Sequence, residues 1–139
     1  MNRFLLDTST ISLAMRRNPD QRVLRSMSEN GRECAMASLT WHELRYGVLR
    51  LPKGKRRGDL MAFLDEVLAP SVEVLPYDER AASWHATERV RMEKLGKPRP
   101  FVDGQIAAIG VTNGLPVVTA NPKDFRGFKG VNVLNWANG

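Results

Sequence analysis

The sequence predicts an α/β fold: a single-domain α/β/α sandwich with a central, mainly parallel sheet. Short apolar runs alternate with longer amphipathic segments, which is the pattern of strands joined by crossover helices. The 139 residues are 42% hydrophobic, enough for one continuous core but short for two domains. No internal repeat or interdomain linker divides the chain. We therefore expect residues 1–139 to form one domain.

The N-terminal part predicts a strand, two helices and a second strand. The apolar residues 4–6 form the first strand, and cap-type residues after it lead into a helix over 11–16. Apolar residues at helical spacing predict a second helix over 21–28, which Asn30-Gly31 ends. The run 34–37 is the next strand.

The middle of the chain predicts two amphipathic helices and an edge strand. An apolar stripe marks a helix over 41–51, and the charged stretch 52–58 is expected to be an exposed connection. A second stripe predicts a helix over 60–68. Residues 72–75 alternate in hydropathy, as a half-buried strand does.

The C-terminal part continues the alternation. Asp78 is expected to cap a long helix over 79–95, and a proline-stiffened loop precedes a helix that opens at Asp103. Strands are expected over 116–119 and 131–134. With these the predicted sheet is complete.

Four carboxylates stand where the predicted strands end or the helices begin: Asp7, Glu43, Asp103 and Asp124. In a parallel sheet these places share one edge, so the four side chains should converge there. Crowded carboxylates repel one another and lose hydration, so they stay ionised only if a cation neutralises them. The pattern therefore predicts a hard divalent metal at the carboxyl edge of the sheet.

Each acid also has a purely structural interpretation. Asp7 could be a helix N-cap, and Thr40 and Glu43 match the S/T-x-x-E capping box. Asp103 could be a first-turn acid favoured by the helix dipole, and Asp124 could close a turn. These four interpretations leave the shared edge unexplained.

Three polar side chains next to the acids are candidate supporting residues: Ser9, Thr119 and Asn121. They could orient neighbouring carboxylates or hold a water on a metal ion. Their alternative role is ordinary turn chemistry, which Asn121-Pro122 satisfies fully.

The charge balance points to a polyanionic substrate. Lys and Arg outnumber Asp and Glu by 21 to 15, which gives a net charge of +6. A basic surface around an acidic, metal-binding pocket suits a phosphodiester backbone. Two basic groups flank the predicted site, and the residues expected to bind nucleic acid are Arg45, Arg50, Lys97 and Arg99. A merely solvated basic face is the alternative.

Other signals narrow the function. Cys34 is the only cysteine, which excludes an intrachain disulfide and a cysteine zinc cluster and favours a reducing compartment. Only three apolar residues precede Asp7, far too few for a signal peptide or membrane span, so we expect a cytoplasmic protein. No nucleophile-elbow, P-loop or dinucleotide motif appears.

With these segments in order, the chain resembles the PIN-domain ribonucleases, specifically the VapC-like and FitB-like toxins of toxin–antitoxin pairs. The resemblance covers nearly the whole chain and rests on Leu6-Asp7-Thr8-Ser9, Thr40–Leu44 with Gly47, Asp103–Ala108 and Thr119–Phe125. Many relatives carry Arg where this chain has Ala120, so one substrate contact is expected to be missing or supplied from elsewhere.

The resemblance implies a toxin that is a Mg²⁺- or Mn²⁺-dependent endoribonuclease, a homodimer and a cognate antitoxin. By this likeness the four acids form the catalytic site, with Asp7 and Asp103 binding the metal directly. Glu43 and Asp124 would bind a second ion or orient waters. Metal-activated water would attack phosphorus in line, without a protein nucleophile.

Two other functions remain open from sequence alone. A Mg²⁺-dependent phosphomonoesterase is disfavoured because Asp7-Thr8-Ser9 lacks the second aspartate of aspartyl-phosphate phosphatases. A noncatalytic RNA-binding or scaffold domain would keep the fold and use the acids as helix caps. Neutralising single acids distinguishes these interpretations.

Overall fold

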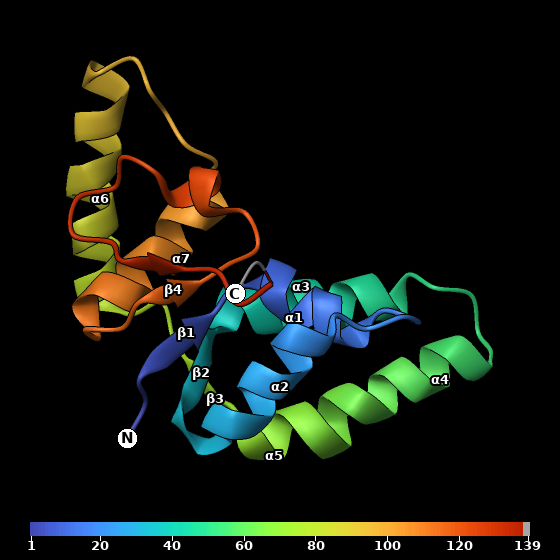
Figure 1. Cartoon of the computed structure of the whole chain (residues 1–139). Helices are drawn as coiled ribbons and strands as arrows, with labels where there is room; N and C mark the ends of the chain where they lie inside the picture. The colour runs from blue at the N-terminus through green and yellow to red at the C-terminus, as the bar shows by residue number, and fades with distance from the viewer. Residues whose placement is uncertain (138–139) are drawn as a thin grey trace.

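A five-stranded parallel sheet forms the centre of the computed structural model, which describes residues 1–137 (Figure 1). The strand order is β3-β2-β1-β4-β5, and every neighbouring pair is parallel. The strands are β1 (Phe4–Leu6), β2 (Cys34–Ala37), β3 (Glu73–Leu75), β4 (Val117–Val118) and β5 (Val133–Leu134). The prediction of an α/β fold with a central parallel sheet is confirmed.

The helices connect the strands as crossovers. They are α1 (Thr8–Met15), α2 (Gln21–Asn30), α3 (Ser38–Leu49), α4 (Lys55–Ala62), α5 (Ala69–Ser71), α6 (Glu79–Lys94) and α7 (Phe101–Thr112). A π-helical stretch, η2 (Phe63–Leu68), joins α4 to α5 in one continuous rod. Two 3₁₀ turns, η1 (Gly31–Glu33) and η3 (Pro122–Phe125), precede β2 and follow β4.

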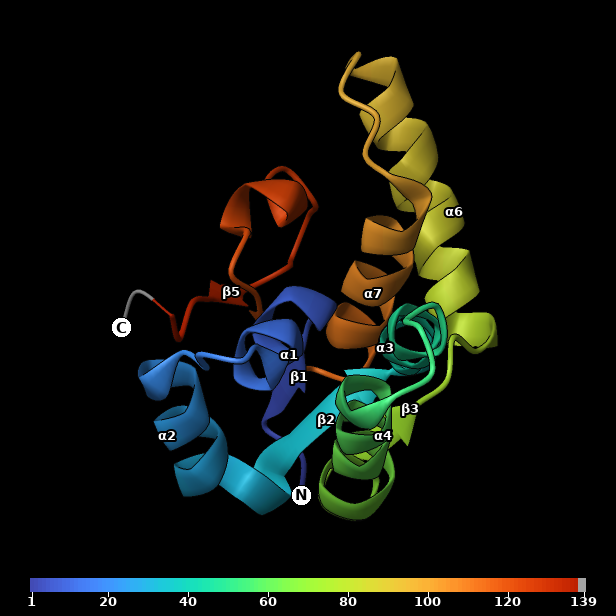
Figure 2. The same ribbon diagram turned by 90° about the vertical axis from the view of Figure 1, so that its right-hand side faces the viewer.

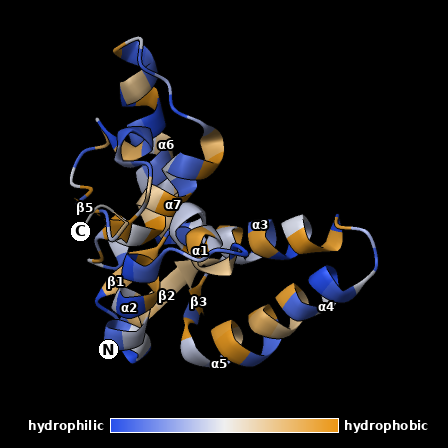
Figure 3. Cartoon of the chain, turned by 45° about the vertical axis from the view of Figure 1, so that its right-hand side comes forward, coloured by the Kyte–Doolittle hydropathy of each residue, from blue (hydrophilic) through white to orange (hydrophobic). Residues whose placement is uncertain are grey.

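Each face of the sheet has its own apolar core, because successive side chains of a strand point to opposite faces. Leu5 of β1 packs with α6 and α7, whereas Leu6 packs with α1, α3 and η2. Figures 1 and 2 accordingly place α6 and α7 on one side of the sheet and α2 and α4 on the other. The inner strands are apolar along their whole length (Figure 3), as strands covered on both faces must be.

Several element boundaries differ from the sequence prediction. Helix α4 begins at Lys55, inside the stretch 52–58 that was expected to be a connection. Lys55 pairs with Asp59 at 2.8 Å, and such an i,i+4 pair lets a polar first turn be helical without being buried. Helix α3 begins at Ser38 rather than Trp41, and β5 begins at Val133 rather than 131. The difference at α3 bears directly on the role of Glu43.

Candidate active site

The candidate site lies at the topological switch point of the sheet. β1 and β4 are neighbours, and the chain continues from β1 to β2 on one side of this pair and from β4 to β5 on the other. Asp7 follows β1 directly, and Thr119 follows β4. The Asp7 amide donates to the Val118 carbonyl at 2.8 Å, which fixes these two strand ends against each other. Crevices of this kind are where open parallel sheets bind ligands.

Asp7 is held by two hydroxyl groups from opposite ends of the sequence. Its Oδ2 accepts from Thr119 Oγ1 at 2.8 Å and from Ser9 Oγ at 3.1 Å. Each hydroxyl in turn accepts from a backbone amide: Ala120 N–H donates to Ser9 Oγ and Asn121 N–H donates to Thr119 Oγ1, both at 3.0 Å. This network is closed, so it orients the Asp7 carboxylate with little freedom.

The N-cap interpretation of Asp7 is wrong. Asp7 occupies the N-cap position of α1, but its side chain makes no capping hydrogen bond. The carboxylate is only 8% exposed, and this burial raises its pKa. The Thr119 and Ser9 hydroxyls and the Thr8 amide pull the pKa back down, and the nearby charge of Glu43 raises it. Asp7 is therefore a buried carboxyl directed into the site rather than a helix cap.

Glu43 does not complete a capping box either. Helix α3 starts at Ser38 with Ala37 as its N-cap, so Thr40 lies inside the helix and caps nothing. Thr8 Oγ1 instead donates to Glu43 Oε1 at 2.7 Å, and its oxygen lies 3.2 Å from Thr40 Oγ1. A residue next to Asp7 thus ties Glu43 to the same edge of the sheet.

Asp103 shows that the four acids share one electrostatic environment. It is half-buried in the first turn of α7. Burial is the largest cause that raises its pKa, followed by the negative charges of Asp124, Asp7 and Glu43 in that order, and the pKa lies at about 6. The Arg99 guanidinium opposes these effects. Asp103 therefore lies within electrostatic reach of three acids that come from distant parts of the sequence.

Asp124 reaches the group from η3. The buried Phe125 anchors this turn in the core, and the Asp124 amide donates to the Asn121 carbonyl at 3.0 Å. Asp124 is half-buried, and its charge is the largest Coulombic influence on Asp103. The Asn121 side chain makes no capping bond to η3, so its contribution to the site comes from its backbone amide.

The donor set fits a hard divalent cation that keeps some of its water. Within residues 1–137, no three Asp, Glu, His or Cys side chains stand close enough to hold one ion together as they are placed. Mg²⁺, however, binds through one or two carboxylates and retains several waters. A cation at this edge would offset the negative charges that raise the pKa of Asp103, without needing a closed cage of ligands.

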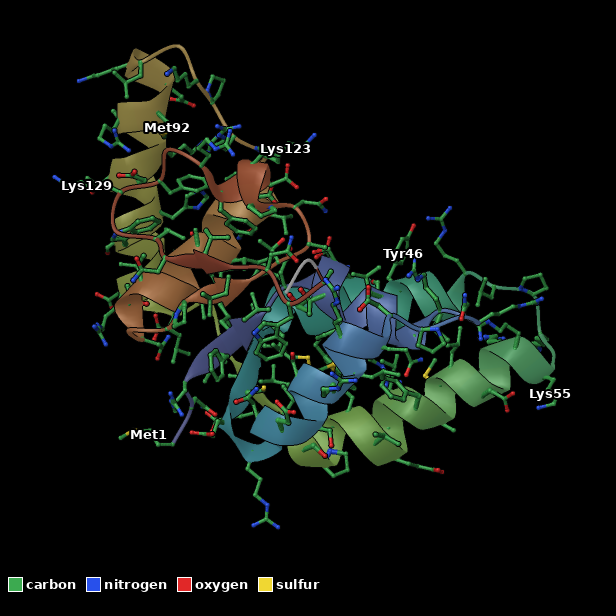
Figure 4. The ribbon with its side chains drawn as sticks, in the orientation of Figure 1. Met1, Tyr46, Lys55, Met92, Lys123 and Lys129 are labelled. Atoms are coloured by element: carbon green, nitrogen blue, oxygen red, sulfur yellow. The ribbon has the colours of Figure 1, made fainter. Side chains whose placement is uncertain are left out.

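The four basic residues predicted to contact nucleic acid differ in how far their side chains are already engaged by other protein groups. Arg45 pairs with Asp65 at 2.6 Å and lies over the Trp41 ring, so part of its charge is already neutralised. Arg50 lies over the ring of Tyr46, which Figure 4 shows on α3. Both are half-exposed or exposed on α3, the helix that carries Glu43.

Lys97 and Arg99 lie in the stretch before α7. The Lys97 side chain is exposed, whereas Arg99 is half-buried and donates through Nη2 to the Arg126 carbonyl at 2.8 Å. Arg99 is also the cation that acts on Asp103. Of the four predicted basic residues, Arg99 is thus linked most directly to the acids.

Sequence reasoning missed Thr8 and the backbone amide of residue 120. Thr8 was assigned only to the cap-type run, and its bond to Glu43 spans 35 residues, which no local pattern reveals. Its position immediately after Asp7 was the available signal. At position 120 the side chain is Ala, but the backbone N–H still holds Ser9.

The described part of the chain contains no helix long and apolar enough to cross a membrane.

A family model for the PIN domain matches residues 4–130. "VapC ribonuclease Y4jK" of Sinorhizobium fredii is 31% identical over 94% of this chain and 95% of its own length. "Toxin FitB" of Neisseria gonorrhoeae is 33% identical over 87% and 89%.

Solved structures agree with these sequence relatives. In the crystal structure of DNA-bound VapBC from Salmonella typhimurium, one chain matches with a TM-score of 0.86 and 28% identity, covering 98% of this chain and 99% of that chain. The resemblance predicted from the sequence motifs is therefore confirmed over the full fold. The chain belongs to the PIN domain family, among its VapC-like and FitB-like toxins.

Proposed function

We propose that this chain is the ribonuclease toxin of a toxin–antitoxin pair and that it hydrolyses RNA phosphodiesters at the carboxyl edge of the sheet. The observation that carries the assignment is the gathering of carboxylates at this edge: hydrogen bonds hold Asp7 and Glu43 there, and their charges together with that of Asp124 act on Asp103. The relatives named as a VapC ribonuclease and a toxin support the same reaction class.

In this proposal Asp7 and Asp103 hold Mg²⁺ or Mn²⁺, while Glu43 and Asp124 take a second ion or orient waters. The bound cation supplies Lewis acidity, which activates water at neutral pH and stabilises charge on the phosphate oxygens. The protein supplies the orientation: Ser9 and Thr119 fix Asp7, and Thr8 fixes Glu43.

The basic residues bind the substrate backbone. Exposed Lys97 and half-buried Arg99 precede α7, which carries Asp103, while Arg45 lies on α3, which carries Glu43, and Arg50 is the C-cap of α3. A net charge of +6 strengthens RNA association without specifying sequence. Sequence preference then comes from base contacts rather than from these charges.

The proposal includes the partners that the family implies. The solved VapBC complex supports an antitoxin partner for this chain. We also propose that residues 1–139 act as one domain and that two copies form a homodimer. Size-exclusion chromatography with light scattering of the full chain measures the second of these.

Brief expression of the chain in bacteria, followed by sequencing of RNA 5′ ends, tests the function. Cleavage ends present with the parent and absent with Asp7→Asn are expected, because the variant removes a charge and leaves the fold. Asp78→Asn is the matched control, since Asp78 is a true N-cap that accepts from Ala81 N–H at 2.9 Å. Identical cleavage patterns from the parent and Asp7→Asn would rule the proposed site out.

A further inference from the structure

A small cavity beside the acidic site combines two guanidinium groups with an aromatic ring. It measures about 170 Å³. It lies between α6, the stretch before α7 and Phe128. Figure 4 labels Lys129, the residue after Phe128, and Met92 of α6. The lining includes Arg89, Arg99, Phe101 and His85. This volume is below the 300–1,000 Å³ or so of pockets that enclose a small molecule, so it suits one group of a larger ligand.

Arg99 is incompletely satisfied where it stands. Its Nη2 donates to the Arg126 carbonyl, but its Nε is buried and has no hydrogen-bond partner within residues 1–137. The neighbouring Arg91 is different, because it bonds to the Glu88 carboxylate and to the Gly127 carbonyl. Arg91 therefore has a structural role, whereas Arg99 lines the cavity and has a single side-chain hydrogen bond, through Nη2.

Arg89 and Phe101 form an exposed platform at the cavity. The Arg89 guanidinium lies 4.8 Å from the centroid of the Phe101 ring, and Phe101 is 49% exposed. The buried His85 packs edge-on against the same ring at 5.1 Å and fixes it. Among residues 1–137, Glu93 is the one acid that lines the cavity, and its 3.5 Å pair with Arg89 is solvent-exposed and weak. The cavity is thus net cationic.

The position of this platform points to the substrate of the acidic site. Phe101 precedes Asp103 by two residues in the first turn of α7, and Arg99 acts electrostatically on Asp103. A phosphate can accept from both guanidinium groups, and a base can stack on an aromatic ring or on an arginine plane. The pairing of two guanidinium groups with an exposed ring suits a nucleotide, which offers a phosphate and a stacking base in one unit.

We propose that this cavity is a nucleotide subsite for the RNA strand: Arg89 and Arg99 hold a phosphate next to the scissile one, and Phe101 stacks its base. The inference rests on the proposed ribonuclease function and assigns two residues, Arg89 and Phe101, that the acidic site does not use. Because this chain has Ala120 where many relatives carry Arg, the cavity would also supply a guanidinium contact to RNA that residue 120 does not.

Binding of a short mixed-sequence single-stranded RNA to the full chain tests the subsite, with Asp7→Asn as the background so that the RNA stays intact. Arg89→Gln is expected to weaken binding and to lower the slope of log K against log salt concentration by about 0.7, the value for one phosphate contact. Arg89→Lys keeps the charge and should retain most of that slope.

Phe101→Leu tests the stacking separately. It should weaken binding about tenfold, the usual scale for one stacked base, with the salt slope unchanged. With an RNA probe of abasic residues, Phe101→Leu and its parent should bind equally. Arg25→Gln, on the distant helix α2, removes one positive charge and controls for net charge.

Melting temperatures of the variants separate binding from folding. Each is expected to melt within a few degrees of its parent, because Arg89 and Phe101 are largely exposed. An Arg89→Gln effect no larger than that of Arg25→Gln, or an equal Phe101→Leu loss on abasic RNA, would overturn the subsite. A parent chain that leaves RNA intact would instead overturn the proposed function, and cleavage that survives Asp7→Asn would overturn the acidic site, so the failures are distinguishable.

Discussion

Neutralising Asp103 should stabilise the metal-free protein while abolishing its activity. Burial and three neighbouring carboxylates raise the pKa of Asp103 from 3.8 to about 6, so keeping it ionised at neutral pH costs folding free energy. Moving a pKa over this range corresponds to about 3 kcal/mol. Because Asp103 is only half-buried, solvent screening reduces the figure to about 1–2 kcal/mol. Asp103→Asn removes this cost.

The stability gained by Asp103→Asn depends on pH, because the folded and unfolded parent bind the Asp103 proton with different pKa values. Between pH 4 and pH 6 the folded protein keeps a proton on Asp103 that the unfolded chain has released, so parent stability falls as pH rises through this range. Parent and Asp103→Asn should therefore have similar stability at pH 4 and separate by about 1–2 kcal/mol at pH 7. Urea unfolding of both proteins in EDTA measures the difference.

Divalent metal should reverse the order of stability. Mg²⁺ at a hundred times its dissociation constant stabilises a folded protein by about 2.7 kcal/mol, which exceeds the 1–2 kcal/mol or so gained by the substitution. The parent should gain this amount and Asp103→Asn only a fraction of it, because a ligand is lost. Asp78→Asn keeps a capping side chain and should behave like the parent. An Asp103→Asn variant less stable than the parent at pH 7 without metal would refute the crowding argument.

Three other substitutions have expected outcomes. Thr119→Val should cost about 1–3 kcal/mol and reduce turnover, because Asp7 and a backbone amide each lose a partner; urea unfolding and RNA cleavage measure it. Gly104→Ala places a Cβ 2.2 Å from His85 Nε2 and should destabilise by roughly 1–3 kcal/mol, with a smaller loss when combined with His85→Ala. Asp20→Ala should cost about 1 kcal/mol with unchanged cleavage, since Asp20 is a genuine cap.

Each has a result that would contradict it. A Thr119→Val variant with parental cleavage would show that the hydroxyl does not position Asp7. If the stability losses of Gly104→Ala and His85→Ala simply added in the double variant, the His85 ring would not be the group that clashes with a side chain at residue 104. Loss of cleavage in a folded Asp20→Ala variant would extend the site to α2, where the structure places no part of it.

The sequence predicted the convergence of the acids for a topological reason. Parallel strands place their carboxyl ends at one edge, so Asp7 and Thr119 had to meet once the runs at 4–6 and 117–118 were recognised as strands. Strands of this kind are buried on both faces, so they are apolar throughout and easy to recognise. The basic excess and the single cysteine are likewise properties of composition alone.

Only the tertiary structure decided which acids are caps. A capping box exists only if the helix starts at the right residue, and α3 starts at Ser38, which moves Thr40 into the helix and leaves Glu43 to Thr8. The partners of Asp7 lie 2 and 112 residues away, and the raised pKa of Asp103 comes from burial and from charges on three separate segments. Such contacts depend on how the crossover helices pack on the sheet, and a linear pattern of residue types carries no information about distances across the fold.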